Sequence, residues 1–133
     1  MFFQGKAILV SGARQVGKTT LLKAMLEKQP GNILHLDGDD VTVQNLMNRP
    51  NTQQLKQIIG NNNIILMDEA QRIPEIGLTS KIIVDQFEDV QLILSGSSSF
   101  ELFNEVNEPL TGRKWSFYLW PVSWEEGENT PVM

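Results

Sequence analysis

Four short apolar runs recur along the chain, and each is continuous rather than alternating with polar residues. A continuous run of this length is typical of a strand buried on both faces of a sheet. Segments of helical pattern separate the runs, which indicates βαβ units, a parallel sheet with helices on both faces and right-handed crossovers. The four predicted strands are residues 7–10, 33–36, 64–67 and 92–94.

The helical segments are bounded by turn signals. Residues 18–28 form an amphipathic segment that ends before Pro30, and a helix over 52–59 is separated from one over 41–48 by the pair Arg49-Pro50. Pro74 suits the first position of a further helix. Residues 113–119 alternate aromatic and polar side chains, which predicts a fifth strand at an edge of the sheet. A short helix is expected over 100–105.

The first strand leads into residues 12–19, which match the pattern G-x-x-x-x-G-K-[ST] of a phosphate-binding loop. Its glycines allow backbone N–H groups to close around phosphate oxygens. Lys18 can reach the β- and γ-phosphates, and the Thr19 hydroxyl can bind Mg²⁺. The strand before the loop and the helix after it are the context that the motif requires. The predicted nucleotide-binding residues are Gly12, Ala13, Arg14, Gln15, Val16, Gly17, Lys18, Thr19 and Thr20.

The third strand ends in two acids, Asp68 and Glu69. An apolar strand followed by an acid is a Walker B pattern, and it delivers the carboxylate to the edge of the sheet where the phosphate loop lies. Asp68 is predicted to hold Mg²⁺ through water, because Mg²⁺ keeps several waters and takes few carboxylates. Glu69 is predicted to polarise the attacking water. The alternative for both acids is a helix cap or a solvated turn.

Serines follow the fourth strand at 95 and 97–99. Ser97 or Ser95 is predicted to sense the γ-phosphate or orient water, while Ser98 and Ser99 are better suited to cap a helix. The alternative is that all four serve only a turn and its cap.

His35 is expected to be a core histidine, and the acids at 37, 39 and 40 are expected to cap the next helix.

Composition narrows the function further. The 133 residues suffice for one domain with a core, and the absence of cysteine excludes disulfides and thiolate metal sites. No apolar run approaches the roughly 20 residues that span a bilayer, and no secretory signal is visible, so a cytoplasmic protein without membrane partners is expected. The net charge of −5 gives no direct sign of nucleic-acid binding.

Five segments together resemble one family: residues 12–22, 67–74, 94–99, 110–113 and 121–126. In this order they resemble the AAA-like P-loop ATPase domain of a prokaryotic ATP-binding family that usually carries a C-terminal domain of unknown function. The resemblance implies a three-layer α/β fold of the ASCE division, with a five-stranded parallel sheet of order 5-1-4-3-2. It implies that Lys18 and Thr19 carry the loop's roles, that Asp68 serves Mg²⁺, that Glu69 is catalytic, and that Ser97 falls near the sensor position.

Relatives in this family usually continue into a second domain and have a short segment upstream of the first strand. The expected boundaries are therefore an ATPase domain over 1–120 and the start of a linker over 121–133. On this expectation the chain is a truncated part of a larger protein, in which nucleotide binding is a firmer prediction than turnover.

The predicted function is ATP binding and Mg²⁺-dependent ATP hydrolysis, with a nucleotide-dependent switch of little or no turnover as the alternative. A kinase would need a basic lid, but the segment after Ser99 is acidic instead.

Arg113 is either structural or an arginine finger offered to a neighbouring copy in a homo-oligomer. Arg14 and Arg72 are candidates for stabilising phosphate charge within one chain. The biological process is not encoded in these motifs.

Overall fold

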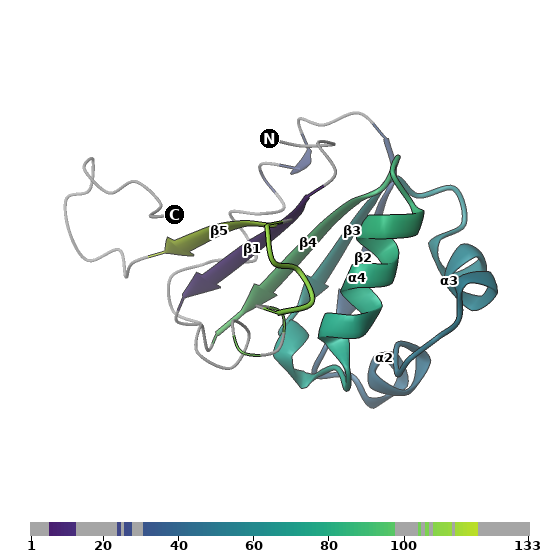
Figure 1. Cartoon of the computed structure of the whole chain (residues 1–133), viewed down its shortest axis with the longest axis horizontal. Coiled ribbons are helices and arrows are strands. Elements are labelled where there is room, and N and C mark those ends of the chain that lie inside the picture. Colours follow the sequence, from purple (N-terminus) through teal and green to yellow (C-terminus); the bar gives the residue numbers. More distant parts are fainter. Residues whose placement is uncertain are drawn as a thin grey trace.

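The computed structural model describes residues 6–12, 24, 26–27, 31–97, 104, 106, 108–112 and 114–119, with the side chains at 11–12 and 115–119 outside the description. Its strands all run in one direction, and they form a single sheet with α4 lying across one face (Figure 1). The elements are β1 (Ala7–Gly12), β2 (Ile33–Asp37), α2 (Val41–Leu46), α3 (Thr52–Ile59), β3 (Ile64–Asp68), the 3₁₀ turn η2 (Ala70–Arg72), α4 (Ile76–Gln86), β4 (Gln91–Gly96) and β5 (Lys114–Leu119).

The sheet has the order β2-β3-β4-β1-β5, and every pair of neighbours in it is parallel. The predicted α/β fold and the order 1-4-3-2 of the first four strands are therefore confirmed. β5 pairs with β1 from Lys114, opposite Ala7, to Leu119, opposite Gly12. Because all five strands run in the same direction, their carboxyl ends lie at one edge of the sheet.

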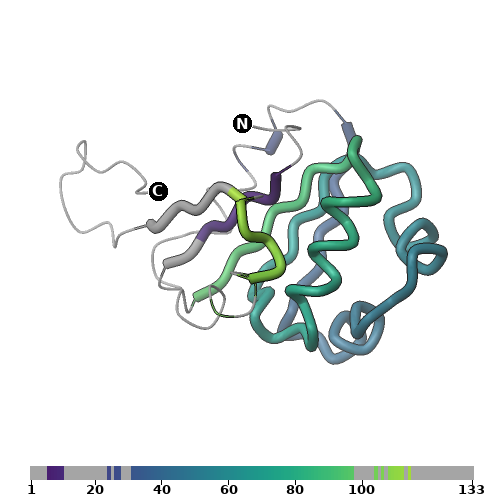
Figure 2. The backbone as a smooth tube through the Cα atoms, viewed as in Figure 1, coloured from purple at the N-terminus to yellow at the C-terminus, as the bar shows by residue number. Residues whose placement is uncertain are grey.

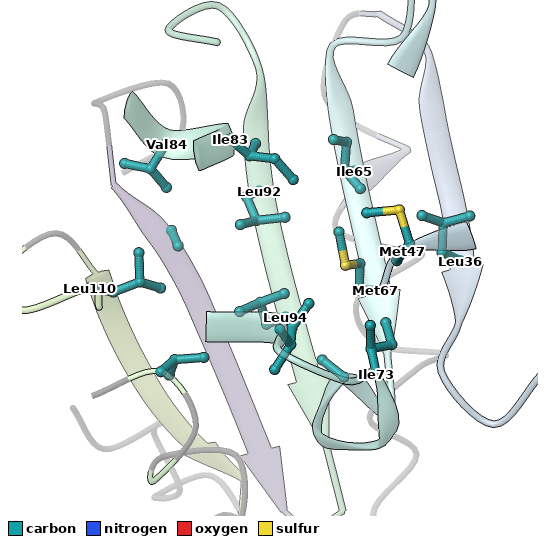
Figure 3. Packing of buried hydrophobic residues seen from close by; sticks show 14 of the residues in the cluster. Leu36, Met47, Ile65, Met67, Ile73, Ile83, Val84, Leu92, Leu94 and Leu110 are labelled. Carbon is teal, nitrogen blue, oxygen red and sulfur yellow. The ribbon is translucent and has the colours of Figure 1, made fainter. Parts of the chain in front are cut away.

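Alternation along the buried strands divides the core into two layers. Ile65, Met67, Leu92 and Leu94 pack on one face against side chains from α3, from α4 and from the residue that follows α2, as Figure 3 shows for Met47 and Ile83. The opposite face carries a second cluster of Ile8, Val10, Ile64, Leu66, Ile93 and Leu26. Leu26 is helical, as the pattern over 18–28 predicts, although most of that segment lies outside the described residues. The central strands β1, β3 and β4 are thus buried on both faces.

Two predictions about individual elements were wrong. β2 is mostly exposed rather than buried on both faces, and His35 is exposed rather than buried in the core, whereas the edge position of β2 agrees with the order 5-1-4-3-2 that the resemblance implies. Pro74 does not begin a helix: α4 starts at Ile76, after Glu75 in the left-handed region at φ 56°. The turn η2 occupies the intervening chain, so the proline follows a 3₁₀ turn and precedes the helix.

The helices α2 and α3 match the predicted 41–48 and 52–59 closely. Asn51 caps α3 in a reciprocal capping box with Gln54, which is the physical reason that the helix begins at Thr52. The backbone trace in Figure 2 shows both helices beside α4, at the β2 side of the sheet. No helix in the described part of the chain is long and apolar enough to cross a membrane.

Candidate nucleotide site

The acids Asp68 and Glu69 lie at the carboxyl end of β3, where the apolar part of the strand is at most 1% exposed. Parallel register brings Met67 opposite Leu94 of β4, and Val10 of β1 opposite Ser95. The ends of β3, β4 and β1 therefore stand side by side in that order. Since β1 ends at Gly12, the first glycine of the predicted phosphate loop, the acids and the first residue of the loop motif share one edge of the sheet.

Two donors among the described residues hold the Asp68 carboxylate. The Ser95 hydroxyl donates to its Oδ1 at 2.6 Å, and the backbone N–H of Glu69 donates to the same oxygen at 3.1 Å. A hydroxyl–carboxylate bond this short belongs to the charge-assisted class, which is about twice as strong as a neutral bond. Ser95 is itself fully buried at 0% exposure, so the orientation of the Asp68 carboxylate is fixed by the neighbouring strand.

Glu69 is buried, with only 5% of its surface exposed, and its backbone lies in the left-handed region at φ 49° and ψ 47°. Three donors from the described part of the chain converge on its Oε1: the Ser97 hydroxyl at 2.8 Å, the Ser97 N–H at 3.3 Å and the Gln71 side-chain amide at 3.0 Å. A non-glycine residue in this conformation costs about 1–3 kcal/mol and persists only where its surroundings hold it. The convergent donors provide that restraint.

The turn after β2 presses against the same backbone. Gly38 donates its N–H to the Asp68 carbonyl at 2.7 Å, and its own carbonyl accepts a bond from the Gln44 side chain at 2.7 Å. A Cβ on Gly38 would lie 2.1 Å from the Glu69 carbonyl oxygen, so only glycine fits there. The turn thereby supports the peptide that carries Glu69.

The acids around Gly38 form the expected cap. Asp40 is the N-cap of α2 and accepts the Thr42 N–H at 2.8 Å, while Asp37 accepts the Asp39 N–H at 2.9 Å. Arg72, a candidate phosphate ligand from the sequence, lies 3.7 Å from Asp39, with more than half of its side chain exposed. Within the part of the chain that is described, no group of three or more His, Asp or Glu side chains is placed to hold a metal ion.

Several predicted site residues lie outside the described residues. These are Ala13, Arg14, Gln15, Val16, Gly17, Lys18, Thr19 and Thr20 of the loop, Ser98 and Ser99, and Arg113. Of the loop, the description includes the backbone of Gly12 alone. The described site therefore consists of Asp68, Glu69, Ser95 and Ser97, which the fold brings into one hydrogen-bonded group.

Sequence reasoning missed two members of this group, Gln71 and Gly38. Gln71 lies two residues after Glu69 and beyond the end of β3, where strand periodicity no longer applies, so its contact depends on the η2 turn. Gly38 stands among three acids that themselves indicate a cap, and the close approach of its Cα to β3 depends on the sheet register. A glycine directly after a strand is the one signal that pointed to such an approach.

Comparison with known proteins places this site in a family. A family model described as an AAA domain matches residues 4–127. Uncharacterized proteins of Mycobacterium tuberculosis and Mycobacterium bovis are each 29% identical over 107 residues, which is 80% of this chain and 23% of the relative. The chain thus spans about a quarter of the length of these curated relatives. A Walker-type ATPase of Pyrococcus abyssi has a similar fold, with a TM-score of 0.61 and 17% identity over 85% of this chain and 49% of that one.

Proposed function

The chain belongs to the AAA domain family of P-loop ATPases, and from this premise we propose that it binds ATP and hydrolyses it in a Mg²⁺-dependent reaction. One observation carries the proposal. The carboxylates of Asp68 and Glu69 are each held by a serine at the carboxyl end of β4, and β4 lies between them and the strand that leads into the loop motif. Paired acids at this edge are what Mg²⁺ binding and water activation require beside a phosphate loop.

The binding roles are proposed as follows. The backbone of residues 12–19 and the Lys18 ammonium bind the phosphates, and Thr19 and Asp68 hold Mg²⁺. The described donor set fits that ion, because Mg²⁺ takes one or two carboxylates and completes its shell with water and phosphate oxygens. A cage of three acids is neither needed nor present among the described residues. When bound, the ion supplies neutralisation of the charge that develops on the phosphates.

Glu69 is proposed as the catalytic base that orients the attacking water and accepts its proton. A carboxylate does this well when its direction is fixed before the reaction, and the Glu69 Oε1 is fixed by Ser97 and Gln71. Ser97 is proposed as the sensor residue, since its hydroxyl and its N–H both contact the catalytic carboxylate. Ser95, which contacts Asp68 instead, is assigned to the Mg²⁺ side of the site.

A nucleotide-dependent switch with little turnover is the second candidate. The burial of Glu69 favours it, because a base that is only 5% exposed and already hydrogen-bonded at Oε1 has restricted access to water. Both candidates share ATP binding and differ in the fate of the γ-phosphate.

The deciding experiment measures ATP binding and single-turnover hydrolysis for the parent chain, Lys18→Ala and Glu69→Gln. Lys18→Ala should abolish binding, whereas Glu69→Gln should bind ATP with unchanged affinity and lose hydrolysis. Glu88→Gln, an exposed acid in the α4–β4 connection, is the matched control and should behave as the parent. Glu69→Gln hydrolysing at the parent's rate would remove Glu69 from the proposed role. A parent that binds ATP without any turnover would establish the switch.

We further propose that residues 1–120 form the ATPase domain and that residues 121–133 begin a linker to a further domain. The greater length of the curated relatives supports a further domain, whereas the match to the AAA domain model extends past residue 120, to residue 127. A chain that ends at residue 120 should bind ATP with the affinity of the full chain, as measured by calorimetry. Loss of binding would place part of the nucleotide site beyond that boundary.

A further inference from the structure

Gln71 is a polar residue at the site to which no role has been assigned. It is the middle residue of η2, the turn that follows Glu69 directly. The turn is fixed by bonds from the Arg72 N–H to the Glu69 carbonyl and from the Ile73 N–H to the Ala70 carbonyl, both at 3.0 Å. Ala70 and Ile73 are buried in the core, so the backbone on either side of Gln71 is anchored. The anchored turn directs the Gln71 side chain toward the Glu69 carboxylate. The side-chain amide of Gln71 donates a hydrogen bond to Glu69 Oε1 at 3.0 Å.

The oxygen of the Gln71 side-chain amide bears on the role of this residue. Its Oε1 is buried and has no hydrogen-bond partner among the described residues. Burying an unpaired carbonyl oxygen lowers stability, and a glutamine retained only for the fold would satisfy both ends of its amide. The bond to Glu69 is thus the polar contact that orients this side chain.

We propose that Gln71 is a positioning residue for ATP hydrolysis, which fixes the direction of the Glu69 carboxylate together with Ser97. The inference rests on the proposed role of Glu69 as the base. Ser97 follows β4, the strand between β3 and β1, so its two bonds draw Oε1 away from its own strand toward the strand of the loop motif. Gln71 approaches the same oxygen from the turn that follows β3. Donors on two elements restrict the direction of the carboxylate, and loss of the Gln71 donor should weaken that restriction.

The test variant is Gln71→Met, which keeps the shape of the side chain but removes both the donor and the unpaired oxygen. We expect kcat for ATP hydrolysis to fall by about tenfold or more, since hydrogen bonds to charged groups are the stronger class. The KM for ATP should stay within about twofold, because the lost interaction acts on the base and not on nucleotide binding. The midpoint of thermal unfolding should change little, because the loss of the hydrogen bond to Glu69 and the removal of the buried unpaired oxygen have opposite effects on stability. Gln57→Met, at an exposed position of α3, is the matched control and should leave kcat unchanged.

This combination separates positioning from a structural role. A structural glutamine would lose stability and activity together, and that result would overturn the proposal, as would an unchanged or raised kcat. Gln71→Glu adds the opposite test: it keeps the shape and places a second carboxylate beside Glu69, so kcat should fall further than in Gln71→Met.

A second readout does not depend on turnover. The side-chain carboxyl carbon of Glu69, observed by NMR in glutamate-labelled protein, should shift in Gln71→Met and remain in place in Gln57→Met. An unshifted resonance overturns the inference even if the parent proves to be a switch that does not hydrolyse ATP. A parent without turnover together with a shifted resonance would instead refute the proposed hydrolysis and retain the contact between Gln71 and Glu69.

Discussion

At the scale of single residues, the site consists of two acids at the end of β3 that accept hydrogen bonds from two serines at the end of β4. The motif at 64–69 was sufficient to predict that Asp68 and Glu69 lie at the carboxyl end of β3, at the edge of the sheet where β1 reaches Gly12. It could not assign Ser95 and Ser97 to one acid each. That assignment depends on the β3–β4 register, in which Met67 lies opposite Leu94, and register is a property of two strands together.

Ser95 gives the first residue-scale prediction. In Ser95→Ala, Asp68 loses the donor at 2.6 Å, so its carboxylate is held less firmly in the direction proposed for binding Mg²⁺. We expect ATP hydrolysis to require a higher Mg²⁺ concentration, measured by titrating Mg²⁺ at saturating ATP. The free energy of unfolding, measured in urea, should fall by about 1–3 kcal/mol, because a buried hydrogen bond to a charged group is lost.

Ser80→Ala is the matched control for this change. Ser80 is also buried and lies on α4, but its hydroxyl has no hydrogen-bond partner in the described part of the chain. Its removal should leave both the Mg²⁺ requirement and the unfolding free energy unchanged, or raise the latter slightly. Equal losses in the two variants would mean that the Ser95–Asp68 bond contributes nothing beyond packing.

At the scale of elements, prediction was accurate where a pattern has one physical interpretation and wrong where it has two. Continuous apolar runs predicted four strands, but a run does not reveal how deeply its strand is buried, and β2 proved to be mostly exposed, His35 included. Pro74 is compatible with a helix start, yet the left-handed Glu75 moves the start of α4 to Ile76. The turn after β2 was predicted as a cap and serves as one, while its support of β3 was unforeseen.

Gly38→Ala tests that support. The added Cβ would meet the Glu69 carbonyl oxygen at 2.1 Å, and because that atom is backbone, β3 or the turn must shift. We expect the unfolding free energy to fall by about 1–3 kcal/mol, as for an overpacked core, and kcat to fall because the peptide that carries Glu69 moves.

Gly60→Ala is the matched control for Gly38→Ala, because it also adds a Cβ to a glycine but lies away from the site. Gly60 has φ 57°, and an added Cβ there would meet no described atom within 4 Å, so alanine is strained without touching the site. The variant should lose about 1–2 kcal/mol of stability and retain its kcat. If Gly38→Ala also retained the parent's kcat, the turn would support the fold but not the catalytic glutamate.

At the scale of the whole molecule, the two edges of the parallel sheet, at the carboxyl and amino ends of its strands, carry different residues. The carboxyl edge carries Asp68 and Glu69, whereas β5 begins at the opposite edge, where Lys114 pairs with Ala7. Arg113, the residue before Lys114, lies outside the described residues. The homo-oligomer proposed from the sequence requires that Arg113 serve the nucleotide of a neighbouring copy.

Mixing variants tests this arrangement. Arg113→Ala alone should bind ATP and lose hydrolysis, and Lys18→Ala alone should lose binding. If Arg113 acts in trans, a mixture of the two should recover part of the activity, because a Lys18→Ala copy can present its intact Arg113 to the intact loop of an Arg113→Ala copy. A mixture of Lys18→Ala with Glu69→Gln should recover none, since both residues serve the nucleotide of the same chain. Hydrolysis by Arg113→Ala at the parent's rate would make Arg113 structural, and loss without recovery on mixing would assign it to its own chain.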